Sequence, residues 1–291
     1  MPAKITRQMS NIKLLFIVAL LAVCSFCYSS SSAVQIAVHP TDLFPGDAFV
    51  IKILDMETPS KTTACIDEKR IPLGPCGNDC LLGVGVVDPD AQPGEKIVIV
   101  NTEREQMLTR ISVKKAEYPE QHLKLPKKQV ELSPKDLARV NREADRLKKI
   151  WTARTERLFE SSFAMPLPNP VITVYGARRI MNDRIISIHG GVDIRGRLGE
   201  AIKASNRGRV ALVDNLFYGG NTVVIDHGLG IFTVYMHLDR SAVNSGDLVS
   251  KGDLIGLVGS SGRSTGPHLH FGAKILSSNA NPVSLINLPI E

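Results

Sequence analysis

Two histidines stand one residue apart in the segment STGPHLHFG, which has the apolar, glycine-flanked pattern of a β-strand. Because side chains alternate between the two faces of a strand, His268 and His270 are expected on one face, with Leu269 on the other. Both rings could therefore reach a single site. Imidazole binds metal ions and carries protons near neutral pH, so the pair can serve either chemistry.

A second motif, HGGVD, offers a further histidine together with a carboxylate. His189 and Asp193 bracket two glycines and a valine, and glycine lets the backbone turn tightly enough for the two side chains to converge. An imidazole with a carboxylate is a usual mixed ligand set for zinc. With one ring of the HLH pair they would complete a three-ligand site, and the other ring would be free to move a proton.

Two more histidines lie in the same region, His237 in the segment YMHL and His227 in the segment DHG. Isolated histidines are more often surface or core residues than functional ones. His227 lies in a predicted glycine-rich hairpin turn, so we predict a structural role for it.

Together these motifs resemble the lysostaphin-like or LytM-type zinc endopeptidases, which cut the peptides of peptidoglycan. Three signatures occur in order, HGGVD, YMHL and GPHLHFG, within a similarity that runs from YGARRI at Tyr175 to NPVSLI at Ile286. The stretches GNTVVIDHGLGIFTVYMHL and GDLVSKGDLIGLVGSSGRSTGPHLHFG match almost continuously. One signature alone is weak, whereas three in order are specific.

The resemblance implies one zinc ion per chain, held by His189, Asp193 and His270. It assigns His237 and His268 to the attacking water and the transition state. Three protein ligands leave the fourth tetrahedral position open, where zinc lowers the pKa of a bound water to roughly 7. A neutral imidazole within reach can deprotonate that water, and a second can stabilise the oxyanion.

The sequence departs from the family pattern at two places. Members that cut glycine bridges have a tyrosine shortly before the HxxxD histidine, but the segment NDRIISI has none and offers only Asn182 and Arg184 as substitutes. The segment GEAI also stands where many relatives have a Gly-Thr-Pro-Val turn. The missing tyrosine favours D-alanyl-diaminopimelate cross-links over glycine bridges as the substrate.

The elements that position these residues are mainly β. Residues 34–116 contain short alternating apolar runs separated by Pro, Gly and Asp turns, which predict a small β-sandwich-like module. Residues 117–160 form a linker with an amphipathic helix. Residues 161–291 are predicted as the antiparallel β-sheet zinc hydrolase domain, with no helical periodicity after the segment MPLPNP.

One long helix is predicted within the segment LSPKDLARVNREADRLKKIWTARTERLF. Ser133 is a good N-cap, Pro134 suits the first helical position and Asp136 suits the helix dipole. Apolar residues then recur at helical spacing or its multiples, and we expect this stripe to pack on a neighbouring domain: Leu137, Val140, Ala144, Leu147, Trp151 and Leu158.

The N-terminus begins with basic residues, continues with the apolar run LLFIVALLAVCSFC and ends in small residues at Ala33. This order predicts a secretory signal peptide over residues 1–33. One alternative is a membrane anchor, for which the run is shorter than the roughly 20 residues needed. Another is a lipoprotein signal ending at Cys24, where the preceding valine is bulky.

Charge and cysteine content bound the partners and the compartment. The net charge of +6 loses three positive charges with the signal peptide and is then too mild for nucleic acid. We expect peptidoglycan as the partner, export to the periplasm or cell envelope, and no stable membrane anchor after cleavage. An oxidising compartment predicts one disulfide and one free thiol among Cys65, Cys76 and Cys80.

The sequence therefore predicts a zinc-dependent endopeptidase that hydrolyses peptide bonds in the stem or cross-link peptides of peptidoglycan. The alternative is a catalytically silent protein that binds the wall or activates an amidase. Family members with that fate have lost zinc ligands, whereas all five site residues are present here.

Overall fold

The computed structural model describes residues 33–55, 61–124, 131–183 and 185–290. The predicted signal peptide, apart from Ala33, and Arg184 lie outside the described residues. Within the described ranges, no helix combines the length and hydropathy that a membrane span requires.

The first part of the chain forms two β-sheets. One has the strand order β1-β3-β7-β6 and the other β2-β9-β8-β4-β5, as the predicted sandwich requires. The strands are β1 Gln35–His39, β2 Asp42–Leu43, β3 Ala48–Leu54, β4 Thr63–Ile66, β5 Lys69–Ile71, β6 Leu73–Gly77, β7 Cys80–Val86, β8 Gly94–Asn101 and β9 Gln106–Val113.

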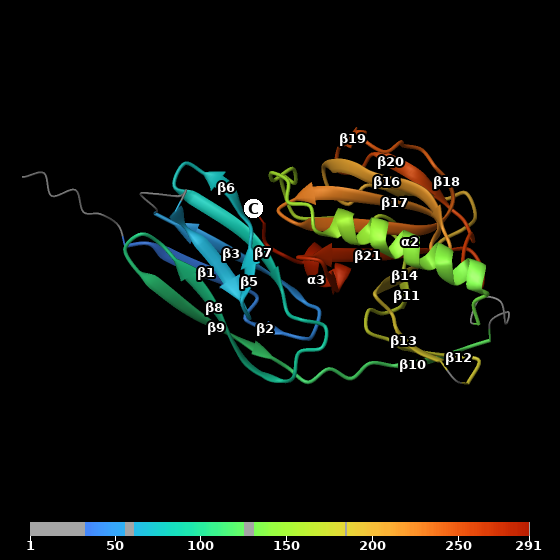
Figure 1. Ribbon diagram of the computed structural model, residues 1–291. Helices are drawn as coiled ribbons and strands as arrows, with labels where there is room; N and C mark the ends of the chain where they lie inside the picture. The colour runs from blue at the N-terminus through green and yellow to red at the C-terminus, as the bar shows by residue number, and fades with distance from the viewer. Residues whose placement is uncertain (1–32, 56–60, 125–130, 184, 291) are drawn as a thin grey trace, which may run out of the picture. The chain divides into compact units, whose positions relative to one another are not determined.

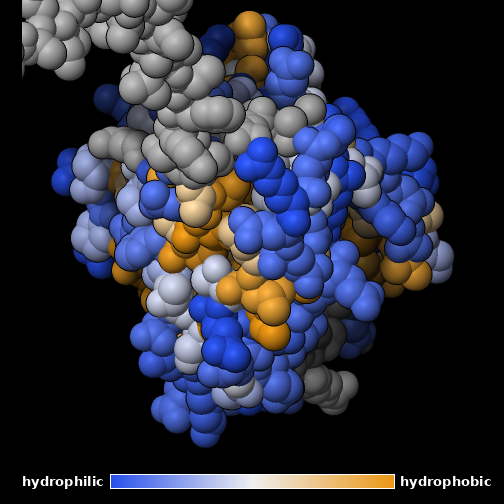
Figure 2. Space-filling model, turned by 90° about the vertical axis from the view of Figure 1, so that its left-hand side faces the viewer, coloured by the Kyte–Doolittle hydropathy of each residue, from blue (hydrophilic) through white to orange (hydrophobic). Residues whose placement is uncertain are grey.

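Alternation explains these strands. In β8, Val98 and Val100 are fully buried, whereas Ile97 of the same strand is 44% exposed. Figure 2 shows the face of the molecule formed by these two sheets, which is mostly hydrophilic with an apolar patch.

A disulfide joins Cys76 to Cys80, and Cys65 is free. The prediction of one bridge and one thiol is confirmed.

The second part of the chain is built on a ten-stranded sheet whose main path is β11-β14-β21-β18-β17-β16-β19. Its pairings are antiparallel, as expected, and its central strands β14, β21 and β18 are direct neighbours. The strands are β11 Val171–Thr173, β14 Gly191–Arg195, β15 Ala201–Lys203, β16 Gly208–Leu216, β17 Gly220–Gly228, β18 Ile231–Ser241, β19 Leu248–Val249, β20 Leu254–Val258, β21 His268–Ile275 and β22 Ser278–Ala280.

A small sheet connects the expected linker to the region before HGGVD. Strand β10 (Glu120–Leu123) pairs in parallel with β12 (Arg178–Met181), which pairs with β13 (Ile185–Ile188). The residues between the sandwich and the helix therefore include a strand that sequence reasoning did not predict.

Helix α2 (Pro134–Trp151) begins as predicted, because the Ser133 hydroxyl accepts a hydrogen bond from the Asp136 amide at 3.1 Å. The expected continuation towards Phe159 is wrong. After Trp151 the chain instead bonds to the end of β17, with the Leu229 amide donating to the Thr155 carbonyl at 3.0 Å. A Cβ on Gly228 would lie 1.9 Å from the Glu156 carbonyl oxygen, so this approach requires glycine.

The apolar stripe of α2 docks through its C-terminal half only. Leu147 and Trp151 pack on the large sheet, and the Trp151 ring lies 5.4 Å from that of Phe232 in an edge-to-face contact. Leu137 is 50% exposed. Figure 1 shows α2 running across the strands β16 and β17, where Arg146 pairs with Asp214 of β16.

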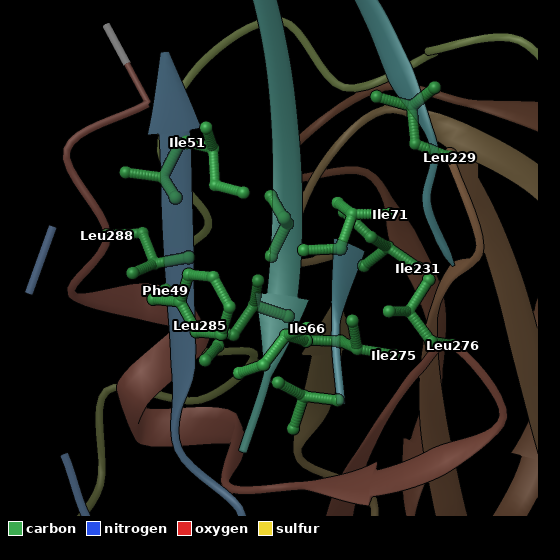
Figure 3. Close-up of a cluster of buried hydrophobic side chains, with 14 of the residues drawn as sticks. Phe49, Ile51, Ile66, Ile71, Leu229, Ile231, Ile275, Leu276, Leu285 and Leu288 are labelled. Atoms are coloured by element: carbon green, nitrogen blue, oxygen red, sulfur yellow. The ribbon is translucent and has the colours of Figure 1, made fainter. Parts of the chain in front are cut away.

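One apolar cluster contains residues of both the sandwich and the large sheet. Figure 3 shows Phe49 and Ile66 of the sandwich in the same cluster as Ile231, Ile275 and Leu285. Leu285 belongs to helix α3 (Pro282–Ile286). The prediction that only strands follow the segment MPLPNP is therefore wrong at this helix, where Pro282 and the N-cap Asn281 start a single turn.

His227 is a core residue. It lies in strand β17, so its predicted place in the hairpin turn is wrong. The residue is fully buried, and its ring nitrogens contact the Arg207 carbonyl at 2.8 Å and the Thr233 hydroxyl at 2.7 Å. Burial lowers the pKa of His227 to about 4. The ring is thus neutral in the folded protein at neutral pH, in agreement with a structural role.

This burial makes folding stability depend on pH. An unfolded histidine binds its proton at a pKa of about 6.5, whereas folded His227 binds it only near 4. Its contribution is fully present above pH 6.5 and is lost as the pH falls towards 4, by on the order of 3 kcal/mol. In denaturant unfolding across this range, His227→Gln should show a shallower fall than the wild type. Equal pH slopes would contradict the prediction.

Candidate metal centre

The positions of Asp193 and His270 follow from strand register. Strand β14 pairs antiparallel with β21, and Asp193 stands directly opposite His270. Residues opposite each other in such a pair have Cβ atoms about 5 Å apart, and here Asp193 Oδ1 lies 3.0 Å from His270 Nδ1. A Cβ on Gly191 would lie 2.9 Å from His270 Nε2, so the glycine leaves room for the ring.

His189 reaches the same point from the residues that precede β14. Its Nδ1 donates to the Val174 carbonyl at 2.9 Å, and its backbone amide donates to the Ala177 carbonyl at 2.9 Å. Its Nε2 lies 3.0 Å from Asp193 Oδ1 and 2.9 Å from His270 Nδ1. The three side chains predicted as ligands therefore converge, and their ligand atoms lie within 4.8 Å of one another.

This geometry fits a cation. With the Nδ1 proton of His189 donated to a carbonyl, the neutral ring presents only a lone pair at Nε2. That lone pair faces a carboxylate oxygen 3.0 Å away, and two acceptors do not bond to each other. A tetrahedral ion about 2 Å from each ligand atom requires ligand separations of about 3.3 Å, close to those of this triangle.

His237 reaches the site through an unusual backbone. Strand alternation places Tyr235 in the core and would send His237 to the same side, but His237 has a φ of +66°. The strand changes partners here, since Met236 pairs with His270 of β21 and Leu238 with Val258 of β20. Left-handed backbone at a residue other than glycine is costly and concentrates at functional sites.

The turned backbone places His237 beside the HLH pair. Its ring lies 4.9 Å from that of His268 and 6.1 Å from that of His270. His237 Nδ1 donates to the Ser261 carbonyl at 2.9 Å, and His268 Nδ1 donates to the Gly266 carbonyl at 2.8 Å. Each neutral ring is then left with an Nε2 lone pair. The Nε2 of His268 lies 3.7 Å from Asp193 Oδ1.

The surroundings of the site favour neutral rings at His237 and His270 and an ionised carboxylate at Asp193. Burial raises the pKa of Asp193, but the close approach of His189 and His270 outweighs it and holds that pKa below its usual range. Burial, with the neighbouring histidines, lowers the pKa of His237 to about 3, and burial lowers that of His270. Ionised carboxylates and neutral imidazoles are the forms that bind metal ions.

Arg179 is a site residue that sequence reasoning missed. Its guanidinium pairs with Asp193 Oδ2, and its Nε donates to Gln121 Oε1 of β10 at 3.0 Å. Asn182, proposed earlier from the sequence, lies in the turn after β12 with a φ of +49°. Arg179 reaches the site because residues 178–181 pair with β13, which leads directly into HGGVD.

A cavity of about 250 Å³ opens beside His270 between the sheet and helix α2. Leu147 and Trp151 of the helix line one side, and Gly272 and Met236 line the sheet side. The metal centre therefore adjoins a space that is mostly apolar and partly covered by the helix.

Comparison with known proteins agrees with this geometry. Residues 187–283 match the model of Peptidase family M23. This range is therefore similar to an M23 peptidase domain. The matched range contains each of the converging residues His189, Asp193, His237, His268 and His270.

The M23 domain has named relatives. Peptidoglycan DD-endopeptidase ShyA of Vibrio cholerae is 43% identical over 86 residues, 30% of this chain and 20% of ShyA. DD-carboxypeptidase/endopeptidase Mpg of Neisseria meningitidis is 41% identical over 98 residues, 34% of this chain and 23% of Mpg. The chain thus matches about a fifth of the length of these curated relatives.

One solved structure is similar over most of the chain. A Pseudomonas aeruginosa protein assigned to peptidase M23 superposes with a TM-score of 0.66 at 25% identity, over 84% of this chain and 94% of its own. The similarity therefore extends well beyond the M23 domain.

Proposed function

We propose that this protein is a zinc-dependent endopeptidase that hydrolyses peptide bonds in the stem or cross-link peptides of peptidoglycan. One observation carries the proposal: His189, Asp193 and His270 converge on a point that fits a tetrahedral cation, with two more neutral imidazoles beside it. A silent wall-binding or amidase-activating protein does not need this complete set. The similarity to ShyA and Mpg, which are both named as endopeptidases, supports the same reaction.

The roles of the residues follow from their protonation. Zinc held by His189, Asp193 and His270 would polarise the scissile carbonyl and acidify a bound water. His237 and His268 offer Nε2 lone pairs at the same place, because their Nδ1 protons are donated to backbone carbonyls. One ring accepts the proton of the attacking water and later passes it to the leaving amine. The other takes a proton from solvent and then donates a hydrogen bond to the oxyanion.

The substrate sets the location. Peptidoglycan lies outside the cytoplasmic membrane, so the proposal includes export to the periplasm or cell envelope by the predicted signal peptide. A Cys76–Cys80 disulfide is consistent with an oxidising compartment. We further propose D-alanyl-diaminopimelate cross-links as the bonds cleaved.

Digestion of purified sacculi tests the proposal. The mature chain loaded with zinc should convert cross-linked dimers to monomers, seen by mass spectrometry, with glycan strands and their peptide attachments intact. Removal of the metal by a chelator should stop the reaction, and added zinc should restore it. Binding to sacculi without any release would favour the silent alternative, and release that survives metal removal would exclude a zinc mechanism.

A further inference from the structure

Arg263 is a cation in the loop that holds two of the site histidines, and no role described above uses it. It lies in the loop before β21, between two residues that hold the site histidines. The Ser261 carbonyl accepts from His237 and the Gly266 carbonyl from His268. The loop that fixes both imidazoles therefore also fixes Arg263.

The guanidinium of Arg263 is held from one side only. It stacks on the ring of Tyr218 with its central carbon 4.2 Å from the ring centroid, and its backbone amide donates to the Tyr218 carbonyl at 2.9 Å. Within the described part of the chain, no carboxylate or carbonyl accepts a hydrogen bond from this guanidinium. A stacked guanidinium with its edge free has the geometry for bidentate binding of a carboxylate.

A second guanidinium lies close by. Burial lowers the pKa of Arg263, and the charge of Arg179 lowers it further, against the opposite effect of Tyr218. The side chain of Arg179 is only 21% exposed, and it is fixed by Asp193 and Gln121. Asp193 is the one carboxylate among the converging residues, and the two guanidiniums together with a bound cation would outweigh its charge, so the site favours an anionic substrate group.

The proposed substrate has such a group at one place next to the reacting bond. In a D-alanyl-diaminopimelate cross-link, the carbon that bears the scissile amide nitrogen also bears a free carboxylate. In a glycine bridge the corresponding carboxyl is part of the next peptide bond. We propose that Arg263, with Arg179 beside it, forms a subsite that binds this carboxylate and so selects the diaminopimelate cross-link. This subsite rests on the endopeptidase function proposed above.

Two soluble cross-linked dimers that differ at one group provide the test. One has the free carboxylate on the carbon next to the scissile nitrogen, and the other has a carboxamide there. A hydrogen bond between charged groups is strong enough that the wild type should cleave the free acid with a kcat/KM about 10- to 100-fold higher. Arg263→Gln should lose this preference, mainly through KM for the acid, and Arg263→Lys should keep part of it.

Arg240→Gln is the matched control, because that arginine lies on β18 with its side chain 74% exposed. It should keep the wild-type preference. Equal cleavage of the two dimers by the wild type would overturn the subsite and leave the endopeptidase function standing, even if Arg263→Gln did not fold. A preference that survives in folded Arg263→Gln would also overturn it. Cleavage of neither dimer would refute the endopeptidase function and, with it, the subsite.

Discussion

Replacement of His237 by asparagine is expected to lower the rate of cross-link hydrolysis by a factor of about 10² to 10⁴ while the protein keeps its metal. The reason is geometric. His237 is 7% exposed and its ring lies 6.1 Å from that of His270, but His237 is not one of the three converging ligands. Asparagine suits this test because it tolerates left-handed backbone better than most residues.

Metal content and kinetics on the same preparation distinguish the outcomes. Asp239→Asn is the control, since this residue lies on the same strand with its side chain 46% exposed. It should retain both metal and rate. A near-wild-type rate in His237→Asn would remove His237 from proton transfer and oxyanion support, and loss of metal in that variant would make it a ligand.

Replacement of His270 by alanine is expected to abolish tight metal binding. Residues that only hydrogen-bond to ligands typically contribute 10- to 100-fold to metal affinity, so loss of a direct ligand should weaken binding by more than about 100-fold. Competition with a chromophoric chelator measures this affinity in the absence of substrate. The result then depends on ligation alone and not on catalysis.

The neighbouring histidine of the same pair is the control. His268 lies on the same face of β21, and its Nε2 is 3.7 Å from Asp193 Oδ1, against 3.0 Å for His270 Nδ1. His268→Ala should therefore bind metal as the wild type does and lose activity. The reverse pattern, with metal lost in His268→Ala and kept in His270→Ala, would exchange the two roles.

The sequence predicted the parts of the fold that depend on local pattern. Alternating runs became strands such as β3, β8 and β21, and Ser133 and Pro134 began helix α2 as expected. The end of α2 was not predictable from its apolar spacing. It is decided by long-range backbone bonds between residues 155–159 and the end of β17. Strand β10 was missed because its partner β12 lies far away in sequence.

The site residues also fall into two groups, those whose positions follow from local sequence pattern and those whose positions depend on long-range contacts. The period of a strand predicted that His268 and His270 share a face, and the opposition of Asp193 to His270 is consistent with the ligand set implied by the family resemblance. The same period fails for His237, whose position depends on a left-handed residue where β18 changes partners. Arg179 could not be found from spacing, since its contact with Asp193 requires the small sheet that includes β10.

The apolar cluster shared by the sandwich and the large sheet opposes the separation of these two parts of the protein. Ile231, Ile275 and Leu285 pack in one core with side chains of β3 and β4. A protease that cut the chain between these parts would produce two fragments that stay associated, because separation would expose this core to water. For the same reason we do not expect the sandwich to function as an independent domain that recombination can fuse to an unrelated hydrolase. The two parts are expected to be inherited together.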